Sequence, residues 1–264
     1  MVADRRVTGP PGMSIPSSDD PYPGRMSDLV VITGASSGLG LALARSVPFT
    51  AKVVDVSRSG PPDREIEHIA ADLSDPSSWP EVGSRIAGLI DAHQPERAVL
   101  IHAAGTLSPI GFAGEVETDA YVRNVMLNSV SGQVLGHLFL QAVRKLSGRF
   151  DLVMISSGAA TSPYAGWSSY GAGKAALDQW VRNVGAEQRT RGDVRVSSVA
   201  PGVLATPMQA RIRETPEHDF PKVERFHSLH DDGVLVAPED AAERIWAAIE
   251  RGIETGSVID IRDL

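Results

Sequence analysis

The chain of 264 residues contains no cysteine. A protein without cysteine forms no disulfide, has no thiol nucleophile and cannot bind a metal ion through thiolates. Its seven histidines also show no clustered ligand spacing of the H-E-x-x-H kind, so we expect no metal site. These absences exclude thiol enzymes, thiolate-bound metalloproteins and disulfide-stabilised domains.

Long apolar runs are also missing. No run approaches the roughly 20 residues that a membrane-spanning helix needs, and the N-terminus lacks the apolar core of a signal peptide. The net charge of −8 argues against general attraction to nucleic acid or to anionic membranes. We therefore expect a cytoplasmic protein with no nucleic-acid partner and no membrane association.

The composition, 42% hydrophobic and 22% charged, fits one globular domain with a sizeable core. Residues 1–25 are rich in Pro, Gly, Ser and Asp and have almost no apolar periodicity, which predicts a disordered N-terminal extension. Residues 26–264 are predicted to form the single domain.

Seven short apolar runs alternate with longer segments of helical periodicity. The strand candidates are residues 29–33, 52–56, 66–70, 98–102, 152–156, 195–200 and 257–261. Several are almost continuously apolar, as strands covered on both faces are. Ser78-x-x-Glu81 resembles a capping box, and Pro238 and Gly252 bracket a further helix. The pattern predicts an α/β fold: one Rossmann-type doubly wound domain with a seven-stranded parallel sheet flanked by helices.

A glycine-rich segment, "TGASSGLG", follows the first predicted strand and opens a helix. Glycine allows the backbone to turn sharply and approach a pyrophosphate, while the helix N-terminus supplies free N–H donors. The alternative is a glycine-rich turn without a ligand. The residues predicted to line this phosphate loop are Gly34, Ser36, Ser37, Gly38, Leu39 and Gly40.

The segment "YGAGK" places Tyr170 and Lys174 one helical turn apart, with Cβ atoms about 5–6 Å from each other. A phenol has a pKa of about 10, so it needs help to transfer protons near neutral pH. The amine of Lys174 is predicted to lower the pKa of Tyr170. The alternative is an exposed tyrosine beside a solvated lysine.

The spacing G-x-x-x-G-x-G resembles that of the short-chain dehydrogenase/reductase family. Further motifs follow in the family's order: "HAAG" (residues 102–105), Asn128, Ser157 thirteen residues before Tyr170, and "PGVLAT" (residues 201–206). The resemblance runs from about Leu29 to the C-terminus. It implies an oxidoreductase that acts on CH–OH or C=O groups of a small-molecule carbonyl substrate, as a homodimer or homotetramer.

The resemblance also implies roles for single residues. Ser157 holds the substrate oxygen, Tyr170 donates a proton, Lys174 also grips the nicotinamide ribose, and Asn128 completes a proton relay through water. Without the resemblance, Ser157 is a strand-end cap and Asn128 a surface amide. The other cofactor contacts that it implies are Asp72, Leu73, Ala103, Ala104, Gly105, Pro201, Gly202, Val203 and Thr206.

Two of these motifs, "HAAG" and "PGVLAT", contain residues whose contacts the sequence does not decide. In "HAAG", His102 and Ala103 replace the two asparagines common in the family, so we expect the side-chain hydrogen bonds of those asparagines to be lost. Thr206 either orients the nicotinamide carboxamide or is a plain helix N-cap.

Cofactor choice depends on the end of the second strand, where an acidic residue binds ribose and a basic one binds the 2′-phosphate of NADP. By our alignment this position is Ser57, followed by Arg58, which favours NADP(H) over NAD(H). A shift of two residues would instead make Asp55 the ribose ligand.

The segments around Tyr170 and after Pro201 resemble the benzil reductase and sepiapterin reductase branch of the family. We expect Tyr164, Trp167 and Met208, with Ser157, to contact substrate, and residues 206–232 to form a substrate lid. The predicted function is NADPH-dependent reduction of a ketone, such as the vicinal diketone benzil. The alternatives are an NAD(P)-dependent alcohol or sugar dehydrogenase and a non-catalytic NADP-binding regulatory protein.

Overall fold

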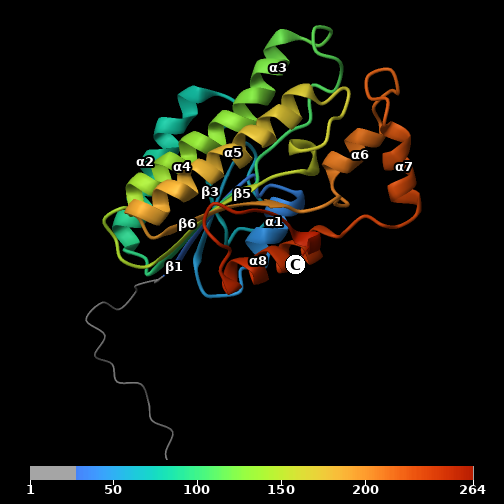
Figure 1. Ribbon diagram of the computed structural model, residues 1–264. Helices are drawn as coiled ribbons and strands as arrows, with labels where there is room; N and C mark the ends of the chain where they lie inside the picture. Colours follow the sequence, from blue (N-terminus) through green and yellow to red (C-terminus); the bar gives the residue numbers. More distant parts are fainter. Residues whose placement is uncertain (1–27, 264) are drawn as a thin grey trace, which may run out of the picture.

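A seven-stranded parallel sheet forms the centre of the molecule, as the sequence predicts (Figure 1). The computed structural model describes residues 28–263, so the predicted extension, residues 1–25, lies outside the described residues. The strand order is β3-β2-β1-β4-β5-β6-β7. The strands are β1 (Asp28–Thr33), β2 (Lys52–Ser57), β3 (Glu67–Ala70), β4 (Arg97–His102), β5 (Arg149–Ile155), β6 (Val194–Ala200) and β7 (Val258–Asp260).

Helices cover both faces of the sheet. Figure 1 shows α2 (Trp79–His93), α4 (Ser131–Val143) and α5 (Ser168–Arg191) on one face, and α1 (Gly38–Arg45) and α8 (Pro238–Arg251) on the other. The remaining helices are α3 (Thr118–Val125), α6 (Pro207–Arg213) and α7 (Val223–Asp231). Short helical segments are Pro76–Ser78, the π-helical Met126–Val130, Gly158–Ala160 and Ile261–Asp263.

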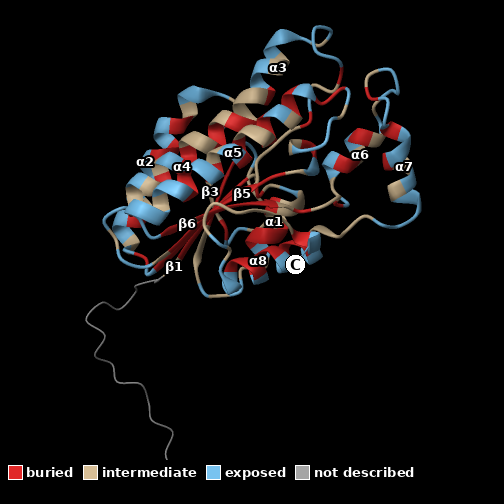
Figure 2. Cartoon of the chain, viewed as in Figure 1, coloured by how far each residue is buried: buried red, intermediate tan, exposed pale blue. Residues whose placement is uncertain are grey.

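The alternation of side chains along each strand gives the sheet two separate cores, shown as the red ribbons of Figure 2. Val31 packs towards α2 and α4, whereas Val30 packs towards α1 and α8. On α5, the apolar stripe that includes Leu177 and Val181 belongs to the first of these cores. This stripe therefore packs on the sheet and its neighbouring helices.

Two predicted helix starts have different outcomes. Helix α8 begins at Pro238 and is followed by Gly252, as predicted. The capping box at Ser78 is wrong, because the Ser78 hydroxyl donates to the carbonyls of Asp72 and Asp75 instead of accepting an N–H of α2. The preceding turn, Pro76–Ser78, already gives Ser78 helical dihedrals, so its side chain faces back along the chain.

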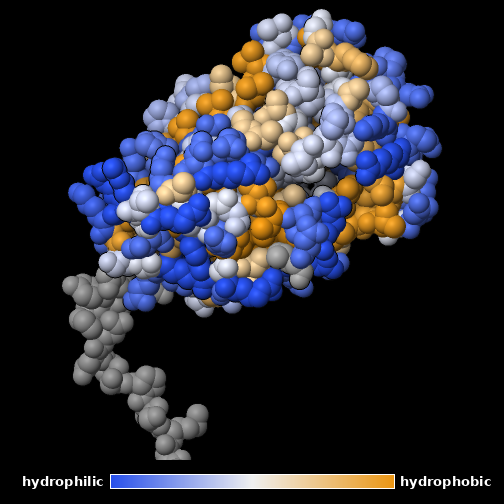
Figure 3. All heavy atoms as spheres, viewed as in Figure 1, coloured by the Kyte–Doolittle hydropathy of each residue, from blue (hydrophilic) through white to orange (hydrophobic). Residues whose placement is uncertain are grey.

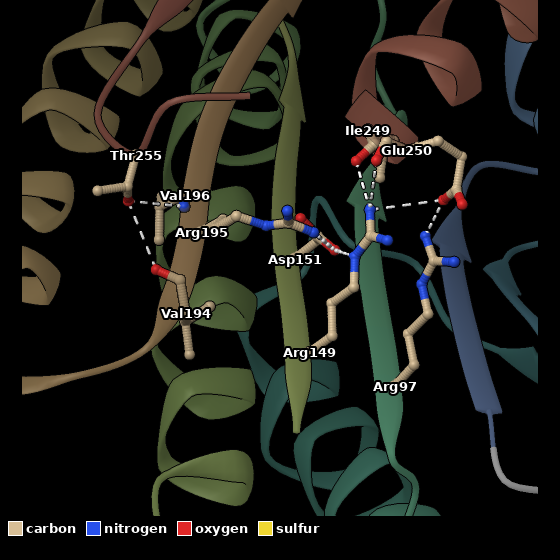
Figure 4. Close-up of polar contacts among 9 residues, drawn as sticks. All are labelled: Arg97, Arg149, Asp151, Val194, Arg195, Val196, Ile249, Glu250 and Thr255. Atoms are coloured by element: carbon tan, nitrogen blue, oxygen red, sulfur yellow. Dashed lines mark hydrogen bonds and ion pairs between the residues drawn. The ribbon is translucent and has the colours of Figure 1, made fainter. Parts of the chain in front are cut away.

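Three arginines gather at the amino ends of the strands and form what we call the arginine cluster: Arg97, Arg149 and Arg195 (Figure 4). Arg149 donates to two backbone carbonyls in the last turn of α8, at 2.6 and 3.2 Å, where a helix prefers a cation. Arg97 pairs with Glu250 of the same turn, and Arg195 donates to Asp151 at 2.7 Å. The cluster ties α8 to the edge of the sheet opposite the strands' carboxyl ends.

Hydrophilic side chains cover much of the face in Figure 3, with hydrophobic patches between them. Within residues 28–263, the large hydrophobic side chains that are exposed are Phe112, Val122, Met208 and Val234. Across the same residues, no helix has the length and apolar character that a membrane span requires.

Candidate active site

A cleft of about 890 Å³ opens at the carboxyl ends of the strands. The strand order reverses direction between β1 and β4, which is where open parallel sheets bind ligands. The loops after β1, β2, β4, β5 and β6 line the cleft, together with α6 and α7. Every predicted site residue lines it except Asn128, which lies behind the lining.

The phosphate loop depends on close backbone contacts that only glycine allows. Gly34 has a φ of +77°, and a Cβ there would lie 2.8 Å from the Cα of Ala104. A Cβ on Gly40 would lie 2.3 Å from the carbonyl oxygen of Gly34. The Ser37 side chain does not cap α1, so the first N–H groups of this helix remain for an anionic ligand. The loop therefore fits a pyrophosphate.

The loop after β6 faces the phosphate loop across the cleft. A Cβ on Gly38 would lie 3.4 Å from the Cγ2 atom of Thr206. Thr206 precedes α6, but its side chain accepts no N–H of that helix. Thr206 thus occupies the N-cap position of α6, but its hydroxyl caps no N–H and is left for the other interpretation, a contact with the cofactor.

At the end of β2, Asp55 is fully buried and does not line the cleft. Its carboxylate accepts hydrogen bonds from the Ala35 N–H at 2.7 Å and the Ser57 hydroxyl at 2.6 Å, and it contacts His68 at 2.9 Å. The shift of register that would make Asp55 a ribose ligand is therefore wrong. The Ser57 hydroxyl already donates its proton to Asp55. Because Asp55 is enclosed, the charged side chain that faces the cleft at this point is the exposed Arg58.

Tyr170 and Lys174 are both buried, with 7% and 3% of their surface exposed, which excludes the alternative of a solvated pair. Helix α5 holds them against the end of β5. The Nζ atom of Lys174 donates to the carbonyl of Ile155 at 2.8 Å and lies 5.9 Å from the Tyr170 ring centre. Ser157 accepts the N–H of Ala159 at 3.1 Å, which leaves its own proton free to donate.

The electrostatics of this pair differ from the prediction. Burial raises the pKa of Tyr170, and the neighbouring Ser157 hydroxyl acts in the opposite direction. Burial lowers the pKa of Lys174 to about 8, and Asp178 opposes that shift. The prediction that Lys174 lowers the phenol pKa is thus wrong for the protein's own groups, because the amine is directed to the Ile155 carbonyl and burial dominates. The phenol is kept protonated, as a proton donor must be.

Asn128 lies within the π-helical segment between α3 and α4 and is fully buried, so it is not the surface amide of the alternative interpretation. Its side chain accepts the Thr106 N–H at 3.0 Å and donates to the Thr106 carbonyl at 2.7 Å and to Asn124 at 2.9 Å. A Cβ on Gly105 would lie 3.0 Å from the Asn128 oxygen and 3.6 Å from the Lys174 amine. Asn128 therefore holds the loop after β4 beside Lys174.

His102 makes hydrogen bonds that we did not expect from its replacement of asparagine. Thr33 Oγ1 accepts the Ala104 N–H at 3.1 Å and forms a hydrogen bond with His102 Nδ1 at 3.0 Å. The other ring nitrogen contacts the Ser131 hydroxyl at 3.4 Å, and that hydroxyl donates to the Leu127 carbonyl. His102 therefore makes hydrogen bonds of its own to Thr33 and Ser131, on two elements, whereas Ala103 has no side chain that can donate or accept one.

Aromatic side chains form one wall of the cleft. Tyr164, Trp167 and Phe226 line it, and Phe220 stacks behind Trp167 with ring centres 4.6 Å apart. The sequence analysis named Tyr164, Trp167 and Met208 as contacts of the substrate. Its predicted lid, residues 206–232, contains further lining residues: Gln209, Ile212, Lys222, Arg225 and Phe226. It gave no role to others, such as Leu107 and Arg262, because nothing in their local pattern distinguishes them from ordinary loop residues.

Comparisons with known proteins show which family this chain resembles in sequence and in fold. The profile of a family described as "short chain dehydrogenase" matches residues 28–217. The chain is 35% identical to the benzil reductase ((S)-benzoin forming) of Bacillus subtilis, covering 89% of this chain and 99% of the relative. It is 31% identical to the sepiapterin reductase of Rattus norvegicus, covering 89% and 96%. The short-chain dehydrogenase/reductase YIR035C of Saccharomyces cerevisiae has the same fold, with a TM-score of 0.78 at 23% identity over 89% of this chain and 96% of that chain.

Proposed function

Because this chain belongs to the short-chain dehydrogenase/reductase family, we propose that it is an NADPH-dependent carbonyl reductase of vicinal diketones such as benzil. Membership of the family makes it an oxidoreductase that acts on CH–OH or C=O groups with NAD(P)(H). The observation that carries the proposal is the meeting of Ser157 and the buried Tyr170 in a cleft that also contains the phosphate loop, where burial raises the pKa of the phenol.

The cleft fits a nicotinamide dinucleotide. The phosphate loop would hold the pyrophosphate, and Lys174 would hold the nicotinamide ribose. Arg58 would hold the 2′-phosphate of NADPH, and the enclosure of Asp55 removes the carboxylate that would favour NADH. When bound, NADPH supplies a hydride from C4 of its nicotinamide to the carbonyl carbon.

The protein's own groups act on the carbonyl oxygen. As the carbon–oxygen π bond breaks and the new C–H bond forms, Tyr170 gives its phenolic proton to the oxygen, which leaves a secondary alcohol. Ser157 donates its own proton to the same oxygen, while its oxygen accepts the Ala159 N–H that holds it in place. The phenolate is then reprotonated from solvent past Lys174, beside the loop that Asn128 holds.

The diketone assignment rests on the names of the relatives and on the aromatic wall beside Tyr170. Initial rates with benzil are measured with NADPH and with NADH, for the wild type and for Tyr170→Phe. We expect a preference for NADPH and a fall in kcat of at least about 100-fold in the variant, in line with the usual contribution of a positioned acid.

Tyr121→Phe is the matched control, since it removes a phenol that does not line the cleft. Its rate should equal that of the wild type. A Tyr170→Phe variant that keeps its rate would contradict the proposed chemistry, and a preference for NADH would favour the alcohol or sugar dehydrogenase alternative. Tight NADPH binding without benzil turnover would reject the diketone.

A further inference from the structure

Two cations line the aromatic end of the cleft without a carboxylate partner. Lys222 immediately precedes α7, and Arg225 lies in its first turn. Within residues 28–263 neither side chain forms an ion pair with a carboxylate. A third cation, Arg211 of α6, lies 3.9 Å from Glu214 in an exposed pair. These groups have no evident task in binding the dinucleotide, whose phosphates fit the opposite end of the cleft.

Tyr164 holds both cations in place. The Nζ atom of Lys222 lies 4.6 Å from the centre of the Tyr164 ring and donates to the Pro163 carbonyl at 3.2 Å. Arg225 donates to the Tyr164 hydroxyl at 3.2 Å. A lysine has three N–H donors and an arginine five, so most of their donors remain unused by these contacts. The two cations are positioned beside the wall that we propose contacts substrate.

Acidic side chains of the same segment are absent from the lining of this end of the cleft. Glu217, Asp219 and Glu224 are not among the residues that line it. Of the described lining residues, Asp72 alone is acidic, and it belongs to the far end, near Arg58. A chain with a net charge of −8 thus presents a locally positive surface in its cleft, and such a surface attracts anions.

A continuous series of aromatic contacts leads from the proposed proton donor to these cations. The ring centres of Tyr170 and Trp167 are 5.8 Å apart, and those of Trp167 and Tyr164 are 4.8 Å apart. A ligand that lies along this wall with its carbonyl at Tyr170 therefore directs its far end towards Lys222 and Arg225. The spacing suits an aromatic body between the reacting carbonyl and an anionic group.

We propose that the preferred substrate is an anionic carbonyl compound, whose aromatic body packs on Tyr164 and Trp167 and whose carboxylate binds Lys222 and Arg225. This inference rests on the proposed reductase function and narrows its substrate class. A neutral diketone such as benzil fills the aromatic part of the site but leaves both cations without their partner.

The test compares benzil with 4-carboxybenzil, which differs by one carboxylate. We measure kcat/KM for both with NADPH, in the wild type and in the double variant Lys222→Met/Arg225→Gln. The wild type should favour 4-carboxybenzil by about tenfold at low ionic strength, an advantage that added salt reduces. The double variant should lose this advantage, so that its kcat/KM falls more for 4-carboxybenzil than for benzil.

The control is Arg144→Gln/Lys145→Met, which removes the same two charges from an exposed site outside the cleft. It should keep the preference for 4-carboxybenzil. Equal kcat/KM for the two compounds in the wild type, or an equal loss for both in the double variant, overturns the proposal.

A parallel titration separates the failure of this inference from that of the proposed function. Binding of both compounds to the protein with NADP⁺ is followed by tryptophan fluorescence, since Trp167 lies in the aromatic wall. Tighter binding of 4-carboxybenzil that needs Lys222 and Arg225, without turnover of either compound, upholds the anion site and rejects the reductase. Equal binding of both rejects the anion site.

Discussion

His102 makes the stability of the protein depend on pH in a range where carboxylates remain charged. Burial, helped by the charge of Lys174, lowers the pKa of His102 from 6.5 to about 3. As pH falls below 6.5, the unfolded chain binds a proton at this histidine while the folded chain does not. The free energy of unfolding therefore decreases as pH falls from 6.5 towards 3, and the contribution of neutral His102 is complete only above 6.5.

The magnitude follows from the pKa difference. Each pKa unit corresponds to about 1.4 kcal/mol, so His102 lowers the free energy of unfolding by about 2 kcal/mol between pH 8 and pH 5. The assay is urea unfolding at pH 8, 6.5 and 5, for the wild type and for His102→Asn, the residue common in the family. The variant should lack this part of the pH dependence. His137→Asn, at an exposed position on α4, is the control and should keep it.

A single result would refute this reasoning. If the wild type and His102→Asn lose the same free energy of unfolding between pH 8 and pH 5, the buried imidazole is not the group that resists protonation. The network from Thr33 to Ser131 would then tolerate a charged ring, and its assignment as a neutral bridge would be wrong.

Two further predictions concern the cofactor side of the cleft. The pKa of Lys174, lowered from 10.5 to about 8, means that above pH 8 the folded chain releases a proton that the unfolded chain keeps. The free energy of unfolding should thus rise by about 2 kcal/mol between pH 7.5 and pH 9.5, and Lys174→Met should abolish this rise in urea unfolding. Arg58→Ala should lower kcat/KM about tenfold with NADPH and little with NADH, since one charge-assisted contact is lost. Initial rates check this, and an equal loss with both cofactors would exclude Arg58 as the 2′-phosphate ligand.

The fold and most of the cleft were predictable because their signals are local. Apolar runs at regular intervals predict the seven strands, and residues that directly follow parallel strands must meet at one edge of the sheet. Gly34 and Ser157 lie within two residues of the ends of β1 and β5, so their sequence positions sufficed to bring them together. Tyr170 lies in the first turn of α5, and its place in the site followed from its spacing to Ser157 and Lys174. The relatives confirm the family resemblance that these motifs carry.

The features of the site that the sequence did not predict depend on contacts between residues far apart in the chain. Nothing next to Asp55 indicates that its carboxylate is enclosed by Ala35 and His68. The helical spacing of Tyr170 and Lys174 was correct, but the amine's partner, the Ile155 carbonyl, is 19 residues away and changed the electrostatics. Likewise, Lys222 and Arg225 reach the cleft only because α7 packs on Tyr164.

The arginine cluster has a consequence for how charge changes spread through the molecule. A strand rises about 3.3 Å per residue, so the length of β5 separates Arg149 from Ile155, whose carbonyl accepts from Lys174, by roughly 20 Å. None of the three arginines is among the groups that shift the pKa of Tyr170 or of Lys174. Modifying the contacts of Arg97 or Arg149 therefore alters how firmly α8 is held without removing any of these causes. The length of the sheet thus keeps the arginine cluster, which anchors α8 at the amino ends of the strands, apart from the cleft at their carboxyl ends.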